Sequence, residues 1–261
     1  MATATPGPRF EGPSLLPDFS HVSVANEGVN VVINALIERA TMATARAPRP
    51  YLGASIVGDP CLRKVQFDWW LASFIDARTQ LKFDRGHSFE PLLREQLEMI
   101  GFSFAPPASL EFRALDDVLR GHADGIVIAK PATPGVYLPP TPFLWEAKAL
   151  NNKNFRAVAR DGLEKTFPKY ATQVVLYQHF LHLRDQALFT AANADTCEVL
   201  HLLVPYGAEK AQAAIARVEM IIDATKRSEL LPRAYGEPED WRCRICPFRT
   251  KCWGLANAAS A

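Results

Sequence analysis

Two carboxylates and a lysine near the middle of the sequence have the types and spacing that metal-assisted chemistry on a phosphate requires. Asp124 lies in the segment GHADG, and Glu146 and Lys148 follow in FLWEAKAL. Carboxylate oxygens hold Mg2+ or Mn2+, which activates water and neutralises the charge that builds on phosphorus. A lysine just beyond the second carboxylate can orient the attacking water or stabilise the pentacovalent phosphorus, and the carbonyl of Ala147 offers a further metal ligand. These residues therefore suit hydrolysis of a phosphodiester bond.

The strand that carries Glu146 and Lys148 strengthens this interpretation. A short D…ExK pattern is weak by itself because it occurs by chance in many chains. Residues 143–150 are otherwise apolar, however, and charges on such a strand are costly to bury unless they are paired or bound to an ion. Because side chains alternate along a strand, Glu146 and Lys148 project from the same face. A hairpin with the strand of Asp124 would bring all three side chains together.

Two further polar pairs stand at helical spacing on either side of these strands. His87 and Glu90 share one predicted helix face, and Gln173 and Tyr177 share another. A histidine near a helix start is commonly a capping or packing residue, and glutamine with tyrosine is an ordinary polar pair on a half-buried helix. Taken singly, neither pair predicts a function.

The cysteines near the C-terminus have a spacing typical of a metal centre. Cys243, Cys246 and Cys252 form C-x2-C-x5-C, and Cys61 stands far upstream. A C-x-x-C loop can wrap one centre because its two sulfurs converge without regular secondary structure. Zinc and an iron-sulfur cluster both accept four thiolates, so the chemistry alone leaves both open. Cys197 lies in a predicted strand and is interpreted as a small core residue.

The hydrophobic pattern predicts the elements that must position these residues, and their mixture indicates an α/β fold. The predicted helices cover residues 29–46, 65–74, 84–100, 154–164, 169–183 and 208–228. The predicted strands cover residues 109–114, 118–129, 143–150, 186–192 and 197–204. The part before the first strand is therefore mainly helical, and residues 241–254 are predicted to be a loop. Residues 1–28 have no sustained periodicity and are predicted to be a flexible arm, which leaves residues 29–261 as a single domain.

Composition excludes several broad classes of protein. The 261 residues include 29 Lys and Arg against 28 Asp and Glu, for a formal net charge of +1. Bulk charge therefore implies neither a histone-like coat for nucleic acid nor a binder of membrane surfaces. The sequence has no apolar run of about 18 residues and no signal peptide at its start. Five unevenly spaced cysteines do not suggest a secreted disulfide framework, so we expect a soluble, cytoplasmic protein.

The motifs, taken in order, resemble those of the PD-(D/E)XK nuclease superfamily, and specifically its RecB-like branch. The matching segments are Arg85-Gly86-His87 with Glu90, Gly121 to Gly125, Glu146-Ala147-Lys148 and Gln173 to Tyr177. The resemblance covers about residues 53–253 and implies a restriction-endonuclease-like core, a central mixed β-sheet flanked by helices. It implies catalytic roles for Asp124, Glu146, Lys148, Gln173 and Tyr177. It further implies that a divalent ion is held by His87, Asp124, Glu146 and the carbonyl of Ala147.

The order of the cysteines is similar to that in iron-sulfur nucleases of the same branch, namely the AddB nuclease domain and the CRISPR-associated RecB-family exonucleases. The resemblance implies a 4Fe-4S cluster held by Cys61, Cys243, Cys246 and Cys252, with zinc as the alternative. Such a centre would cross-link residues 61 and 252 and limit fraying of the domain's two ends.

The resemblance implies DNA as the substrate. The basic residues near the predicted site, which include Arg85, Lys153, Arg156 and Lys169, suit phosphate contacts that carry no sequence information. We find no base-reading motif, which favours DNA ends or single strands. The expected function is a metal-dependent DNA exonuclease of recombination, repair or phage replication, in a bacterium or a phage-infected cell. The alternatives are a CRISPR adaptation nuclease that trims prespacers and a non-catalytic DNA-binding module; a recombination or annealing protein is a possible partner.

Overall fold

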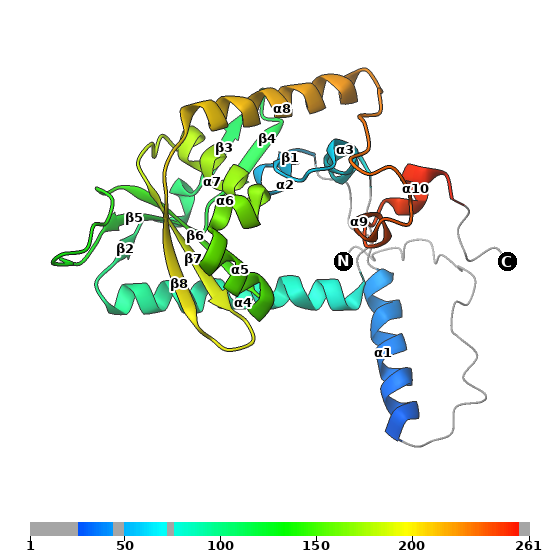
Figure 1. The fold of residues 1–261 in the computed structure, drawn as a ribbon, viewed down its shortest axis with the longest axis horizontal. Helices are drawn as coiled ribbons and strands as arrows, with labels where there is room; N and C mark the ends of the chain where they lie inside the picture. The colour runs from blue at the N-terminus through cyan, green and yellow to red at the C-terminus, as the bar shows by residue number, and fades with distance from the viewer. Residues whose placement is uncertain (1–25, 44–49, 72–75, 256–261) are drawn as a thin grey trace, which may run out of the picture.

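A five-stranded mixed β-sheet is the centre of the molecule (Figure 1). The structure, a computed structural model, describes residues 26–43, 50–71 and 76–255. The sheet's strands, in spatial order, are β2 (Ser103–Phe104), β5 (Gly125–Ala129), β6 (Phe143–Leu150), β7 (Ala187–Asn193) and β8 (Val199–Val204). Every neighbouring pair is antiparallel except β6 and β7, which are parallel. The predicted α/β fold, with a central mixed sheet flanked by helices, is confirmed.

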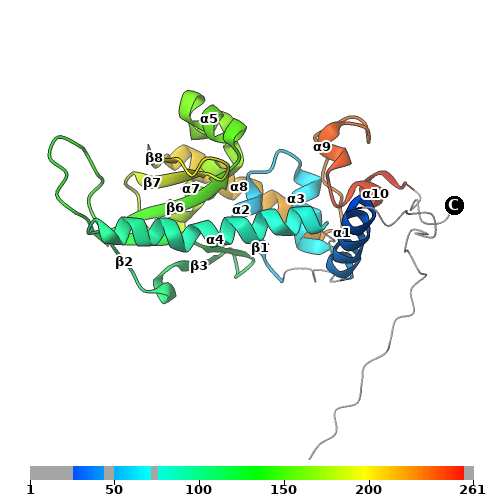
Figure 2. The ribbon, with the colours of Figure 1, turned by 90° about the horizontal axis from the view of Figure 1, so that it is seen from below.

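Strand β6 is predicted correctly to the residue, and its two faces contact different helices. Trp145 and Ala147 point to the side that holds Leu93 and Leu97 of α4 (Ala77–Met99). Leu144 and Leu150 belong to the other core cluster, which includes buried residues of α7 (Pro168–Phe180) and α8 (Ala208–Lys226). By alternation, Glu146 and Lys148 face the α7 side of the sheet. Figure 2 shows α4 running along one side of this sheet, with α7 and α8 behind it.

The parallel connection from β6 to β7 passes through three helices, α5 (Asn152–Asp161), α6 (Leu163–Thr166) and α7. Parallel neighbours require such a crossover because a tight turn cannot join them. Asn151 begins α5 by accepting a hydrogen bond from the Asn154 N–H. Pro168 occupies the first turn of α7, where its missing N–H costs nothing. The crossover therefore places α7 over the face that carries Glu146.

The strand predicted over residues 118–129 is in fact two strands in two different sheets. Strand β4 (Leu119–His122) lies between β1 (Leu52–Gly53) and β3 (Glu111–Ala114) in a three-stranded sheet, whereas β5 pairs with β6. Between β4 and β5 the chain changes sheets, and the Ala123 N–H donates to the carbonyl of Leu110. The apolar pattern continues through this change, so periodicity alone did not reveal it. Asp124 lies at the junction.

Helix bounds differ from the prediction mainly near the N-terminus. Helix α4 begins at Ala77, because Asp76 accepts a hydrogen bond from the Thr79 N–H. The prediction of a start near residue 84 was wrong, and His87 and Glu90 lie well inside the helix. Helix α1 (Asn26–Met42) replaces the predicted helix over 29–46; most of the predicted arm, residues 1–25, lies outside the described residues. Short helices α2 (Ala54–Val57) and α3 (Leu62–Trp70) complete the N-terminal part.

The C-terminal segment departs from the predicted loop because it contains two short helices, α9 (Trp241–Arg244) and α10 (Arg249–Trp253). Trp70, the last residue of α3, is 42% exposed. In the described ranges, no helix combines the length and the apolar character that crossing a bilayer requires.

Candidate active site

Three oxygen groups converge on the ammonium of Lys148. Lys148 Nζ donates to Asp124 Oδ2 at 3.5 Å, to the Ala147 carbonyl at 2.9 Å and to Glu146 Oε1. The groups come from the β4–β5 junction and from β6, which the β5–β6 hairpin brings side by side. These are the three oxygen donors that the sequence associates with a metal ion. In the structure they already surround one cation.

A backbone contact holds the carboxylate of Asp124 in place, and burial encloses that of Glu146. Asp124 Oδ2 accepts a hydrogen bond of 2.8 Å from the Ala147 N–H, which ties the junction to β6. The side chain of Glu146 is fully buried, and that of Lys148 is 21% exposed. The cluster is therefore formed largely inside the protein and opens to solvent beside the lysine.

Helix α7 supplies the next contacts. Gln173 Nε2 donates to Glu146 Oε1 at 2.5 Å and lies 3.2 Å from the hydroxyl of Tyr177. The ring of Tyr177 lies against Gly121, where a Cβ would be 2.5 Å from a ring carbon of the tyrosine. Any side chain at position 121 would displace the helix face, which explains the glycine. The structure thus places Gln173 and Tyr177 beside the carboxylates.

Burial and mutual repulsion control the charges of the cluster. Burial raises the pKa of Glu146 to about 8; repulsion from Asp124 adds to this effect, and the ammonium of Lys148 opposes it. Burial also disfavours the charged form of Lys148, but the two carboxylates outweigh it and raise the lysine pKa. Among the described residues, Glu146 Oε2 is buried and accepts no hydrogen bond. Such an atom is costly to bury without a partner.

The raised pKa of Glu146 predicts how the stability of metal-free protein depends on pH. The folded protein keeps the proton above the ordinary pKa of 4.5, so this contribution to stability is fully present below 4.5 and is lost as pH rises through about 8. We therefore expect the melting temperature of the parent, measured in chelator relative to Glu146→Gln, to fall between about pH 5 and pH 8 and to level off above it. The exposed Glu98→Gln is the matched control and should leave the slope unchanged. A difference between parent and Glu146→Gln that does not vary with pH would contradict the buried, protonated carboxyl.

Helix α4 contributes Glu90 rather than His87. Burial raises the pKa of Glu90, repulsion from Asp124 adds to the effect, and Lys148 opposes it. His87 is exposed, and among the described residues no group of three or more His, Cys, Asp or Glu is arranged to hold a metal ion. The structure therefore brings neither His87 nor Glu90 into one metal-holding set with Asp124 and Glu146. The sequence placed Glu90 in a motif but gave it no role.

Tyr170 is a second residue that sequence reasoning missed. Lys148 Nζ lies 5.7 Å from the centroid of the Tyr170 ring, a distance that permits a cation–π contact. Its ring also packs against Phe167 at 5.1 Å. The available signal was its position one helical turn before Gln173 on the predicted helix.

A second hollow adjoins the cluster on the side of Tyr177. This cavity of about 290 Å³ lies over the three-stranded sheet and includes Tyr51, Ser55, Arg120 and His122 in its lining. The guanidinium of Arg120 lies 4.9 Å from the Tyr51 ring and forms an ion pair with the exposed Asp117. The cavity therefore offers hydroxyl, imidazole and guanidinium groups. It adjoins the hydrogen-bonded network of Glu146 and Gln173 through Tyr177, which lines the cavity and accepts a hydrogen bond from Gln173.

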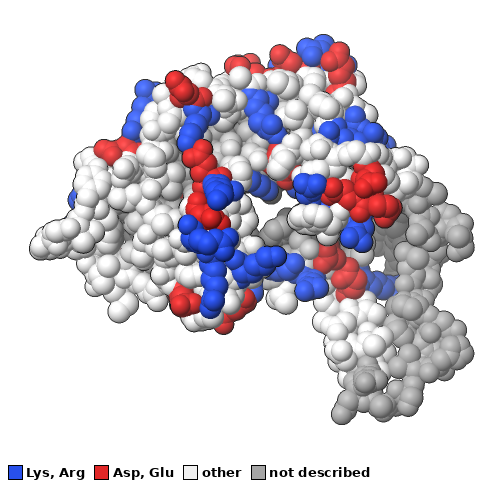
Figure 3. Space-filling model, viewed as in Figure 1, with Lys and Arg blue, Asp and Glu red and all other residues white. Residues whose placement is uncertain are grey.

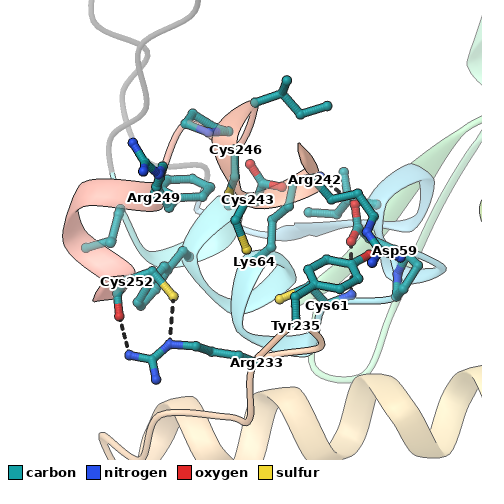
Figure 4. Close-up of a pocket in the computed structure, with 18 of the residues that line it drawn as sticks. Asp59, Cys61, Lys64, Arg233, Tyr235, Arg242, Cys243, Cys246, Arg249 and Cys252 are labelled. Atoms are coloured by element: carbon teal, nitrogen blue, oxygen red, sulfur yellow. Dashed lines mark hydrogen bonds and ion pairs between the residues drawn. The ribbon is translucent and has the colours of Figure 1, made fainter. Parts of the chain in front are cut away.

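The four cysteines of the predicted centre line another cavity, of about 420 Å³ (Figure 4). Cys61 comes from the N-terminal part before α3, and Cys243, Cys246 and Cys252 come from the segment of α9 and α10. The structure thus brings the distant first cysteine to the other three. Among the described residues they do not form a set that could hold a single metal ion. Burial raises the pKa of the Cys246 thiol to about 11.

Arg233 forms two hydrogen bonds with Cys252, the last of these cysteines. Its Nε donates to Cys252 Sγ at 3.4 Å, and its Nη2 donates to the Cys252 carbonyl at 2.5 Å (Figure 4). The guanidinium also lies 4.1 Å from the ring of Trp253. On the other side of the cavity Lys64 forms an ion pair with Asp59, which also accepts a hydrogen bond from the Cys61 N–H. Cations therefore flank the thiols.

The fifth cysteine lies elsewhere, and its interpretation as a core residue was wrong. Cys197 is exposed, with a left-handed φ of 62° in the connection between β7 and β8. The strand begins two residues later than predicted, at Val199. Cys197 directly follows the turn at residues 194–196, and its N–H donates to the carbonyl of Asn193 at 2.7 Å.

The predicted DNA contacts differ in exposure. Arg85, Lys153 and Arg156 are exposed, and Lys169 is half-buried. Figure 3 shows Lys and Arg gathered over α5 and the neighbouring part of α4.

Comparison with known proteins gives limited guidance. No protein-family model matches the chain, and no curated protein matches its sequence. Among solved structures, SSO0001 is similar at a TM-score of 0.46 and 11% identity, over 88% of this chain and 98% of that one. An alkaline exonuclease, LHK-Exo from Laribacter hongkongensis, is similar at a TM-score of 0.44 and 16% identity, over 74% of this chain and 96% of that one. Similarity at this level does not establish a family.

Proposed function

We propose that this protein is a DNA nuclease that requires Mg2+ or Mn2+, of the PD-(D/E)XK type and its RecB-like branch. The observation that carries the proposal is the convergence of Asp124, Glu146 and the Ala147 carbonyl on one cation, the ammonium of Lys148. Few structural roles explain a glutamate and a lysine on a strand whose other residues are apolar and mostly buried, next to an aspartate at the β4–β5 junction.

The donor set fits a divalent ion. All three groups offer hard oxygen atoms, which Mg2+ and Mn2+ prefer. Glu146 Oε2, buried and without a hydrogen bond in the described part of the chain, has an unused lone pair for such an ion. When bound, the ion would make water more acidic and offset negative charge on the phosphate. His87 and Glu90 are the candidates on α4 for an additional ligand.

The protein's own side chains would orient the reactants. Lys148 keeps its proton at neutral pH because of the neighbouring carboxylates, and its ammonium would donate to a phosphate oxygen or to the attacking water. Gln173 restrains Glu146 Oε1 and links it to the hydroxyl of Tyr177. Gln173 and Tyr177 would thus fix the carboxylate and shape the side of the site that faces DNA.

We further propose that the nuclease acts from DNA ends or on single strands without sequence specificity. The basic surface over α5 and α4 (Figure 3) would contact phosphates through Arg85, Lys153 and Arg156, and Lys169 of α7 would add a further contact. The cavity beside Tyr177 would receive a terminal phosphate through Ser55 and Arg120. Both features recognise backbone rather than base edges, which supports exonuclease action.

End-labelled single- and double-stranded DNA tests this function directly. We expect purified protein to shorten labelled DNA with Mn2+ or Mg2+ and to leave it intact in EDTA. Ligated circular DNA of the same sequence is the control for a requirement for ends and should persist longer than the linear form. Full activity in excess EDTA would overturn the metal assignment. No cleavage with any divalent ion, despite DNA binding, would favour a non-catalytic DNA-binding module.

We also propose that Cys61, Cys243, Cys246 and Cys252 hold a 4Fe-4S cluster. All four cysteines line one cavity, which supports a centre that they share. A centre with four thiolates carries net negative charge, which Lys64 and Arg233 would offset. Zinc remains the alternative because it accepts the same ligands.

The biological setting proposed for the nuclease is recombination, repair or phage replication in a bacterium or an infected cell, with a recombination or annealing protein as partner. A prespacer-trimming role in CRISPR adaptation is the alternative. An integrase that co-purifies with the protein would favour the latter, and trimming of integrase-bound DNA would test it.

A further inference from the structure

Residues 57–61, which we call the Cys61 loop, run from the end of α2 to the cysteine that precedes α3. Gly58 is the point at which this loop meets α7. A Cβ atom on Gly58 would lie 2.7 Å from Lys169 Cα and 2.7 Å from Thr172 Cβ, too close for any side chain. The backbone of Gly58, with φ of −78° and ψ of 5°, is open to other residues. Position 58 therefore requires glycine for close contact with α7 and not for conformational freedom.

This contact lies beside the part of α7 that forms the candidate active site. The two residues that Gly58 meets stand three positions apart on one face of the helix, and each is followed directly by an active-site residue, Tyr170 or Gln173. The Tyr170 ring lies 5.7 Å from Lys148 Nζ, and Gln173 Nε2 donates to Glu146 Oε1 at 2.5 Å. A displacement of α7 at Gly58 would therefore move both contacts.

The opposite side of the Cys61 loop is fixed by hydrogen bonds. Arg217 of α8 donates to the two carbonyls on either side of Gly58: its Nε lies 2.9 Å from the Val57 oxygen, and its Nη2 donates to the Asp59 oxygen. The carboxylate of Asp59 accepts a hydrogen bond of 3.1 Å from the Cys61 N–H, at the edge of the cysteine cavity (Figure 4). A loop held at both ends in this way transmits a displacement of the cysteine to the glycine instead of absorbing it.

We propose that the Cys61 loop couples the cysteine centre to the active site, with Gly58 as the contact that positions α7. The inference rests on the proposed nuclease and its cysteine centre. With the centre formed, Cys61 is fixed, and the loop holds the first turn of α7 where Tyr170 and Gln173 reach the lysine and the glutamate of the site. Without the centre the loop moves away from α7, and these contacts loosen. Gly58 is a positioning residue, because it acts on the reacting groups only through α7.

Hydrogen–deuterium exchange of Gly58→Ala tests the contact, since the variant adds one methyl group at a position whose backbone accepts alanine. We expect the amides of α7 to exchange about threefold faster or more than in the parent, and those of β8 to be unchanged. Gly236→Ala is the matched control, because a Cβ there would have no neighbour within 4 Å. If Gly58→Ala does not fold, Arg217→Gln releases the loop from α8 without adding volume and should give the same result. Equal exchange of α7 in the parent and the folded variant would overturn the proposal, whether or not the protein cleaves DNA.

Cleavage measures the consequence at the active site. We expect Gly58→Ala to lower kcat by about tenfold or more, the scale on which a displacement of about 1 Å acts, with little change in KM. Iron and sulfide should stay at the level of the parent, because Cys61 keeps its thiol. General destabilisation would instead lower the metal content and the melting temperature together. A parent-like kcat would overturn the positioning role. An inactive parent would refute the proposed nuclease, and the exchange measurement would still decide the coupling.

Cys61→Ala tests the link from the cysteine end of the loop. Loss of this thiol removes the anchor that the centre provides, so we expect α7 to exchange faster by a similar factor. Cys197→Ala, at an exposed position outside the cavity, is the control and should exchange like the parent. Adding Cys61→Ala to Gly58→Ala should change α7 little further, because the contact that carries the effect is already lost. If Cys61→Ala leaves the exchange of α7 unchanged, the two sites are independent and the coupling is refuted.

Discussion

Replacing Lys148 with alanine should reduce DNA cleavage by about a thousandfold, the scale on which removal of one charge-stabilising donor acts in an enzyme site. The lysine is the only group in the described cluster that donates to both Asp124 and Glu146. Within the described part of the chain, its ammonium is also the only cation that donates to the Ala147 carbonyl. Loss of that charge removes stabilisation of the developing phosphorane but leaves the oxygen ligands in place. DNA binding, measured by fluorescence anisotropy in EDTA, should change little.

Lys153→Ala is the matched control because Lys153 is an exposed lysine of the nearby α5. Its loss should weaken binding a few-fold at low salt and leave the rate at saturating DNA close to that of the parent. Lys148→Arg keeps the charge and, if the fold tolerates the longer side chain, should restore metal-free stability without restoring full cleavage. Undiminished cleavage by folded Lys148→Ala would refute the proposed mechanism. Melting temperatures measured with Mn2+ separate loss of chemistry from loss of folding.

Sequence reasoning succeeded where one strand or one helix determined the geometry. Residues 143–150 form β6 as predicted, and alternation along it puts Glu146 and Lys148 on one face. The spacing of Gln173 and Tyr177 likewise gives one helix face, which the structure directs at Glu146. In both cases a local period of two or 3.6 residues determined the outcome.

Sequence reasoning failed where tertiary contacts determine the bounds of an element or the direction of a side chain. The pattern from Val118 to Ala129 is continuously strand-like, yet the chain changes sheets before Asp124. That change depends on the pairing of β4 with β1 and β3. The hydrophobic periodicity of the segment itself does not predict this pairing. The start of α4 was missed because the apolar stripe begins later than the cap at Asp76. Which of His87 and Glu90 faces the cluster depends on how that longer helix lies across the sheet.

Changing any one of the four clustered cysteines to alanine should remove the brown colour that we expect of anaerobically purified protein. The parent should contain iron and acid-labile sulfide at about four each per chain, as a 4Fe-4S cluster on four thiolates requires. The melting temperature should fall by on the order of 10 °C, because the centre cross-links residues 61 and 252 and its loss frees both ends of the domain. The structure already brings these ends together, with Cys61 on the same cavity as the C-terminal cysteines (Figure 4).

Cys197→Ala is the control that the structure itself supplies, because Cys197 is exposed in the β7–β8 connection and does not line the cavity. It should keep the colour, the iron content and the melting temperature of the parent. Arg233→Gln gives an intermediate case: it removes the guanidinium that donates to Cys252 Sγ, so we expect the cluster to assemble and then bleach faster in air. Stoichiometric zinc without sulfide, in protein made under iron-replete anaerobic conditions, would replace the cluster with a zinc site. The carboxylate–lysine site would stand in that case, because it shares none of its hydrogen-bonded residues with the cysteine cavity.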